Sequence, residues 1–157
     1  MSNELQIYKF APGMNLRTVV IDGEPWFVAK DVCASLGFRD ASNATRGLSS
    51  DKKTTGKVST LGGSQSQTLI SESGFYMLIF RSNKPEARQF THWVTSVVLP
   101  AIRKDGGYVM GEEKVATGEM SMDDTIAKVT LMVETKMRRL ALERASVAGE
   151  LTLVTPN

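Results

Sequence analysis

The sequence predicts an α+β fold, in which a small N-terminal β-hairpin or sheet packs with helices and is followed by a long C-terminal helix. Two observations favour this fold. Apolar runs rich in β-branched residues and separated by turn residues fill the first 30 positions, and apolar residues spaced by three and four follow from residue 70 onward. A chain of 157 residues, of which 41% are apolar, is long enough to bury a core.

Composition excludes several classes of protein. The single cysteine, Cys33, allows no intrachain disulfide and no cysteine-rich zinc site, and the single histidine, His92, allows no metal site built from several imidazoles. No secretory signal and no apolar run long enough to span a bilayer is visible. We therefore expect a soluble, cytoplasmic protein without cofactor, metal or membrane partner. Since no constellation of acid, base or nucleophile stands out, we expect no enzymatic activity.

The first predicted element is a β-hairpin. Residues 16–21 are rich in β-branched side chains, Asp22-Gly23 is typical of a two-residue turn, and residues 25–28 form the expected returning strand. Successive side chains of a strand point to opposite faces, so Trp26 and Phe27 should separate there.

Helices are expected directly after the hairpin. Residues 29–36 place apolar side chains on one face, and Gly37 follows where a helix C-terminus needs it. Asp40 or Ser42 is then expected to cap a shorter helix that runs through Arg46.

A polar, basic loop is predicted over residues 51–63, and a strand over residues 65–70. Ser71 should cap the following helix, whose first turn is acidic at Glu72 and so complements the helix dipole. A further helix is predicted from Pro85, because proline is tolerated in a first turn. Pro100 should kink or restart that helix.

The chain is expected to divide near residue 110. Residues 1–110 carry 13 Lys and Arg against 9 Asp and Glu and hold every aromatic residue, whereas residues 111–157 carry 6 against 8 and hold none. We expect a domain over residues 1–110, a flexible linker over residues 111–120, and a helical tail over residues 121–157 that serves oligomerisation.

The helical tail carries half of a coiled-coil seam. Apolar residues recur every seven positions, and the expected oligomerisation residues are Ile126, Val129, Val133, Leu140 and Val147. Lys136 and Glu143 occupy the alternate positions, where a full seam needs apolar residues. The tail is therefore expected to build a homo-oligomer, a dimer or a tetramer, with packing against the chain's own domain as the alternative.

Several uncommon sequence words occur in an order that resembles one family. They are GEPWFVAKDV at residues 23–32, ESG at residues 72–74, the run WVTSVVLPAIR at residues 93–103, and GGY at residues 106–108. Together they resemble the Bro-N domain, which is found in phage antirepressors and in BRO proteins of large DNA viruses. The resemblance covers roughly residues 5–108 and implies a small α+β domain, often followed by a second domain.

The resemblance implies regulation by binding. Phage antirepressors of this kind bind a repressor protein and keep it from its operators, which switches a prophage to lytic growth in the bacterial cytoplasm. Some viral BRO relatives bind nucleic acid through this domain. The expected function is therefore that of a phage antirepressor whose partner is a phage repressor protein. The alternative is a transcriptional regulator that binds DNA directly through the basic loop of residues 39–57.

Two groups of cations are the candidate binding residues. The first is Arg39, Arg46, Lys52, Lys53 and Lys57, and the second is Arg81, Lys84 and Arg88. The first group has three open interpretations, which are contact with phosphates, contact with an acidic protein partner, and an ordinary solvated surface. The second group either binds a partner or completes surface ion pairs. Tyr76 joins the candidates as an aromatic residue that is expected to be exposed.

Overall fold

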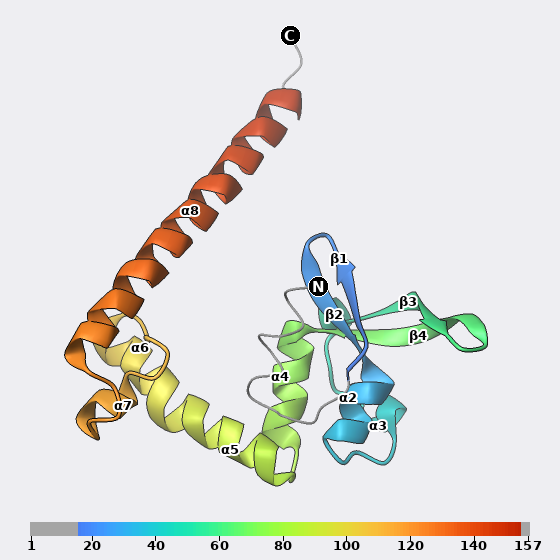
Figure 1. Ribbon diagram of the computed structural model, residues 1–157. Helices are drawn as coiled ribbons and strands as arrows, with labels where there is room; N and C mark the ends of the chain where they lie inside the picture. The colour runs from blue at the N-terminus through green and yellow to red at the C-terminus, as the bar shows by residue number, and fades with distance from the viewer. Residues whose placement is uncertain (1–15, 155–157) are drawn as a thin grey trace. The chain divides into compact units, whose positions relative to one another are not determined.

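The computed structural model describes residues 16–154 of the chain (Figure 1). The described residues form two compact units, divided between residues 96 and 97. The predicted fold class is confirmed, because the chain forms a small four-stranded antiparallel sheet with several helices and ends in a long helix.

The elements of the first unit follow one another in a simple order. They are β1 (Thr18–Ile21), β2 (Glu24–Val28), α2 (Ala29–Ser35), α3 (Ala41–Thr45), the 3₁₀ turn η1 (Ser50–Lys52), β3 (Lys53–Thr60), β4 (Gly63–Ser71), α4 (Glu72–Arg81) and α5 (Pro85–Trp93). A π-helical turn, η2 (Val94–Val98), joins this unit to the next.

The sheet has the strand order β1-β2-β4-β3, and every neighbouring pair is antiparallel. The predicted hairpin between β1 and β2 is confirmed. Asp22 and Gly23 both take a positive φ, of 51° and 79°, as a turn of type I′ requires. The two strands of the centre, β2 and β4, each run directly into a helix, so the sheet fixes where α2 and α4 begin.

The core lies on the face of the sheet that α2 and α4 cover. Phe27 of β2 and Phe75 of α4 are both buried, and their rings lie 4.9 Å apart between centroids. The other face carries a smaller cluster in which Val28, Val58 and Leu69 are buried and Trp26 packs against them. Trp26 and Phe27 thus serve opposite faces, as predicted from the strand period.

The predicted loop over residues 51–63 is wrong. Most of it is strand β3, which pairs with β4 in a continuous register from Lys53 opposite Ile70 to Thr60 opposite Gly63. The segment is polar, but its β-branched residues suit an extended backbone. Gly56 is part of this strand. Glycine is needed there for close packing, because a Cβ at that position would lie 2.6 Å from Cδ1 of Leu69.

The predicted helix starts are confirmed. Ser71 accepts a hydrogen bond from the Gly74 N–H at 3.1 Å at the start of α4, and Asp40 accepts hydrogen bonds from two N–H groups at the start of α3. The α5 helix begins at Pro85. The break expected from Pro100 is also present, since η2 separates α5 from α6, which begins one residue before that proline.

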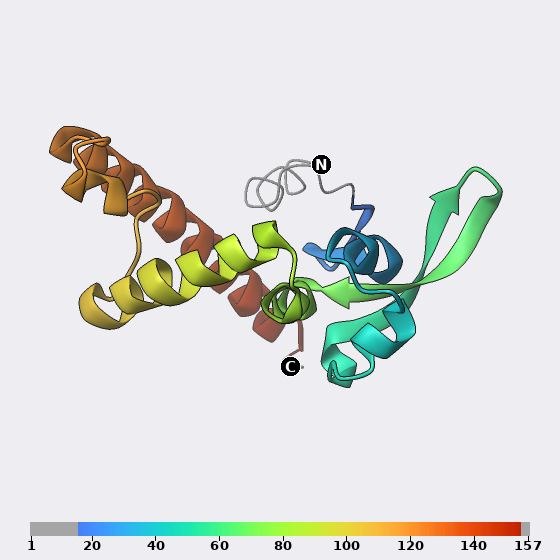
Figure 2. The same ribbon diagram turned by 90° about the horizontal axis from the view of Figure 1, so that it is seen from below.

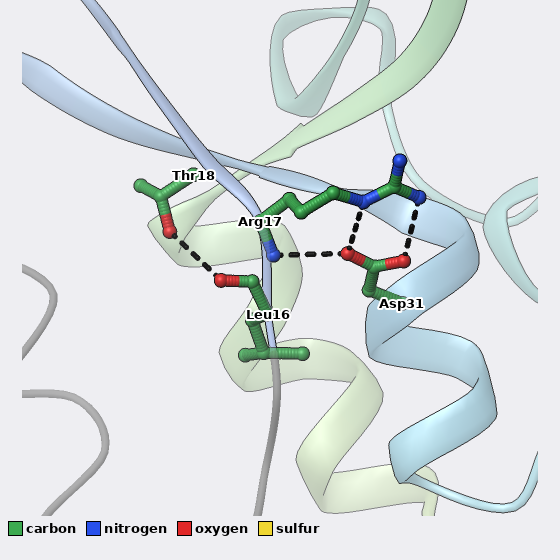
Figure 3. A network of polar contacts seen from close by, with 4 residues as sticks. All are labelled: Leu16, Arg17, Thr18 and Asp31. Carbon is green, nitrogen blue, oxygen red and sulfur yellow. Dashed lines mark hydrogen bonds and ion pairs between the residues drawn. The ribbon is translucent and has the colours of Figure 1, made fainter. Parts of the chain in front are cut away.

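A salt bridge that the sequence analysis did not predict ties the start of β1 to α2 (Figure 3). Asp31 accepts hydrogen bonds from Nε and Nη2 of Arg17, both at 2.8 Å, and from the Arg17 backbone N–H at 2.9 Å. Burial raises the pKa of the Asp31 carboxyl, but the hydrogen bonds and charge of Arg17 outweigh it and hold that pKa below its ordinary value.

The second unit contains α6 (Leu99–Asp105), α7 (Glu113–Ala116) and α8 (Met122–Val154). The long tail helix is confirmed, and Ser121 caps it by accepting a hydrogen bond from the Asp124 N–H at 3.0 Å. The expected linker, residues 111–120, includes α7, and its flexibility in solution stays a prediction. None of the helices in the described residues, α8 included, has the length and apolar character needed to cross a bilayer.

We expect Gly56→Ala to destabilise the first unit by about 1–2 kcal/mol, because the added methyl group displaces a fully buried leucine. The measurement is urea unfolding followed by tryptophan fluorescence, since both tryptophans lie in residues 1–96. Gly107→Ala is the control, because nothing lies within 4 Å of a Cβ at Gly107. An unchanged unfolding midpoint for Gly56→Ala would contradict the close packing of Leu69 on β3.

We expect Asp31→Asn to remove a pH-dependent part of the stability of the first unit. The native pKa of Asp31 is lowered, so its contribution is fully present above the ordinary aspartate pKa of about 3.9 and is lost as the pH falls through the native value. The difference in thermal midpoint between the unaltered chain and the Asp31→Asn variant should therefore be largest near neutral pH and should vanish below about pH 3. A difference that stays constant across this range would contradict the salt bridge.

Candidate functional site

A two-stranded ribbon projects from the sheet of the first unit. Only Leu69, Ile70 and Ser71 of β4 pair with β2, whereas the pairing of β4 with β3 continues to the turn after Thr60. The part beyond β2, residues 55–68, is here called the β3–β4 ribbon, and it extends past the end of β2 in both views (Figures 1 and 2).

The β3–β4 ribbon is polar, carries one cation and is free of acidic residues. No Asp or Glu occurs between Lys52 and Ser71. Lys57 is exposed on β3, and the exposed neighbours are hydroxyl and amide side chains, namely Thr55, Gln65, Ser66 and Thr68. The ribbon thus offers hydrogen-bond donors and acceptors together with positive charge.

The tip of the ribbon carries an apolar residue. Leu61 lies in the turn and is fully exposed, with a relative accessibility of 110%. An isolated exposed leucine is ordinary on a protein surface. At the end of a projecting arm, however, it is the first side chain that a partner molecule would meet.

A cavity of about 430 Å³ lies beside the ribbon, where α2 and α3 face β4. Its charged lining residues are Lys30, Arg39 and Asp40, and Gln67 and Thr68 come from the ribbon. The cavity is therefore a concavity of mixed polar and apolar lining that joins a predicted site residue, Arg39, to the ribbon.

A second cavity, of about 270 Å³, contains two more of the predicted cations. Arg81 and Lys84 line it together with Phe38. The guanidinium of Arg81 lies 5.8 Å from the Phe38 ring centroid, and its Nη1 donates a hydrogen bond to the Ala44 carbonyl at 3.0 Å. Arg81 thus holds α3 against α4, which accounts for its position without a ligand.

The other predicted cations are distributed over the surface of the first unit. Arg46 follows α3 and Arg88 lies on α5, and both are exposed. Lys53 is half-buried at the start of β3, and Lys52 pairs with Asp51 at 3.4 Å. The structure therefore places Arg39 at the cavity and Lys57 on the ribbon opposite Ser66, whereas Arg88 belongs to a separate helix.

Tyr76 is half-buried, not an open stacking surface. Its hydroxyl donates a hydrogen bond to Glu72 at 2.6 Å, and its ring lies 6.0 Å from that of Phe90. Burial, and then the contact with Glu72, raise the pKa of the Tyr76 hydroxyl far above its ordinary value. The residue packs α4 against α5.

The single cysteine and the single histidine of the chain lie in different places. Cys33 is buried in the core, where burial raises the pKa of its thiol and so disfavours the reactive thiolate. His92 is exposed on α5, with Nδ1 at 3.4 Å from the Ser96 hydroxyl. Among the described residues, no group of three or more His, Cys, Asp and Glu side chains is placed to hold a metal ion.

The expected oligomerisation residues all lie on α8. Ile126, Val133, Leu140 and Val147 are exposed, and Val129 is half-buried. The heptad analysis missed Met122 and Met137, which lie on the same side of the helix as these residues. Counting at 3.6 residues per turn, not 3.5, would have found both.

Sequence reasoning also missed Lys30, Leu61 and the ribbon positions Gln67 and Thr68. Lys30 lies in a helix for which the sequence analysis considered only the apolar face. The absence of acidic residues over 20 positions was a readable signal, and it would have singled out the ribbon.

Comparison with known proteins gives a consistent set of relatives. An uncharacterised protein of Haemophilus influenzae is 35% identical over 122 residues, which cover 76% of this chain and 61% of the relative. Two Bro-N domain-containing proteins of Invertebrate iridescent virus 6 are 29% and 31% identical, and each match covers 78% of this chain and 34% of the relative. The chain thus spans about three fifths of the first relative and about a third of the other two. No solved structure matches the chain.

The family model for the N-terminal domain of the BRO family, Bro-N, matches residues 15–100, which is more than half of the chain. The match takes in the sheet, the β3–β4 ribbon and both cavities. The chain therefore belongs to the Bro-N family.

Proposed function

We propose that this chain is a phage antirepressor that binds a phage repressor protein, keeps it from its operators and so promotes prophage induction. The family resemblance supports regulation by binding. The observation that carries the proposal is the projecting β3–β4 ribbon, which ends in the fully exposed Leu61. Binding alone lowers the concentration of free repressor, so the proposal needs no catalysis, cofactor or metal. The place of action is the bacterial cytoplasm, where repressor and operator meet.

The tip of the ribbon suits a protein partner. Interfaces draw most of their affinity from a few apolar or aromatic side chains that enter pockets, surrounded by polar contacts that exclude water. Leu61 would be such an anchor, and the hydroxyl and amide groups of the ribbon would form the rim.

Charge restricts which surface of a repressor this chain would bind. Residues 1–96 carry 11 Lys and Arg against 8 Asp and Glu, and the ribbon itself has no acidic residue. A DNA-binding face is basic, so a mimic of DNA would have to be acidic. The proposed antirepressor therefore does not imitate the operator. It binds a neutral or acidic face of the repressor and acts by blocking its dimerisation or by distorting it.

A second candidate function is direct binding of duplex DNA, and the absence of acidic residues from the ribbon favours it. The major groove is about 12 Å wide and admits a two-stranded ribbon. Gln and Thr side chains are suited to base edges, and Lys57 and Arg39 to phosphates. In this case residues 39–57 would contact DNA through strand β3 and through Arg39 at the cavity, and not through the loop that the sequence predicts.

The antirepressor proposal is tested with the full chain and the repressor encoded in the same phage genome. We expect a complex at micromolar concentrations by size exclusion with light scattering, and release of operator DNA in a gel-shift assay. Leu61→Ser should weaken this complex by about tenfold or more, because it removes the apolar anchor.

Leu142→Ser is the matched control, since it changes a leucine that is 68% exposed on α8. The antirepressor proposal fails if no complex forms. The role of the ribbon fails if the two variants weaken the complex equally.

The DNA candidate is tested by measuring the affinity for duplex DNA as a function of salt concentration. If phosphates are contacted, the logarithm of the affinity falls linearly with the logarithm of the salt concentration, and Lys57→Glu or Arg39→Glu lowers the slope by about one unit. Lys104→Glu, an equal change of charge outside residues 1–96, should leave the slope unchanged. Negligible affinity at low salt would eliminate this candidate.

A further inference from the structure

One face of α8 is largely apolar from Met122 to Val147, and Arg144 is the single charged residue on it. Six apolar residues on it follow one another at intervals of three, four and seven, and they are Met122, Ile126, Val133, Met137, Leu140 and Val147. At 100° per residue they fall within roughly 80° of the helix circumference. We call this set the apolar face of α8.

The described residues of the second unit leave this face open. The six side chains are between 38% and 62% exposed, although large apolar residues normally favour burial. Only Thr125 and Val129 are half-buried on the helix between residues 122 and 149. An uncovered face of this length is typical of an interaction surface.

The charges of α8 divide between its two halves. Residues 122–135 carry three acidic residues, Asp123, Asp124 and Glu134, against the single base Lys128. Residues 136–149 carry four bases, Lys136, Arg138, Arg139 and Arg144, against the single acid Glu143. The first half is thus net acidic and the second net basic.

The helix dipole explains only part of this division. It favours Asp123 and Asp124 in the first turn, but its effect fades within one turn of a helix end. Lys136, Arg138 and Arg139 lie near the middle of α8 and so gain little from it. Their position instead suits a partner helix that carries acidic residues beside the second half of α8.

We propose that the apolar face of α8 is covered by the same face of a second copy of this chain, with the two helices antiparallel. This orientation brings the acidic half of each helix beside the basic half of the other, whereas a parallel pair would set like charges together. The pairing is symmetric, so one surface serves both copies. Residues 122–149 span about four heptads and about 42 Å, enough for a sustained seam.

The proposal is separate from the choice between repressor and DNA as the ligand of the ribbon. In an antiparallel pair the two chains enter α8 from opposite ends. A dimer would therefore carry two copies of the ribbon, and simultaneous engagement of two target sites would raise the overall affinity.

The first experiment is light scattering on the full chain at tens of micromolar. We expect twice the mass of one chain, and we expect Val133→Asp with Leu140→Asp to weaken the association by about a hundredfold or more, because each buries an unpaired charge. Leu131→Asp is the matched control, since Leu131 is 65% exposed and lies on the opposite side of the helix. A measured mass equal to that of one chain would overturn the proposal. So would a control variant that loses association as much as the double variant does.

The second experiment determines the orientation without disturbing the seam. Ala127→Cys and Ala145→Cys each place a spin label off the apolar face, and the buried Cys33 of the unaltered chain serves as the labelling control. In an antiparallel pair the distance between two labels at residue 127 is about 30 Å, and a mixture of the two variants gives a shorter one. The reverse order of distances would overturn the antiparallel arrangement, even if the mass is that of a dimer.

Discussion

The short antiparallel pairing between β2 and β4 is the contact on which the first unit depends. It joins segments more than 40 residues apart, and its three residue pairs are Trp26 with Ser71, Phe27 with Ile70, and Val28 with Leu69. Because side chains alternate along a strand, Phe27 and Ile70 enter the core below α2 and α4, whereas Val28 and Leu69 build the small cluster on the other face. One register thus sets both clusters, and a shift of one residue would exchange them.

The same pairing decides where the proposed binding surface lies. Strand β2 ends at Val28 and continues directly as α2, so β4 and β3 have no further neighbour from β2 beyond Leu69. The remaining length of these two strands becomes the β3–β4 ribbon, and the space between the ribbon and the helices becomes the cavity that Arg39 lines. Gly56 permits close packing at the base of the ribbon, since it leaves room for Leu69 across the strands.

The two units present surfaces of different kinds. The first unit offers a polar and cationic arm with one apolar residue at its tip, which suits reversible contact with another macromolecule. In the second unit α8 offers a long, largely apolar face that includes Arg144, with charges divided along the helix axis, which suits a lasting association of like chains. We infer that recognition belongs to the first surface and assembly to the second.

The sequence by itself determined the local structure. Asp22-Gly23 required a turn with positive φ, Ser71 and Asp40 capped their helices, Pro85 and Pro100 marked helix starts, and the long tail had to be helical. These features depend on a few neighbouring residues. The motifs that resemble Bro-N also lay in the sequence, and the family match confirms the resemblance over residues 15–100.

Only the tertiary structure decided that residues 53–60 form a strand, that Arg17 pairs with Asp31, and that Arg39 shares a cavity with the ribbon. Polar Lys, Thr and Ser residues are compatible with either a loop or an edge strand, and pairing with β4 determines which of the two forms. Arg17 and Asp31 are 14 residues apart, and the residues next to each of them do not predict that the two will pair. Contacts between distant residues depend on the register of the sheet, which is a property of the whole fold and of no single segment.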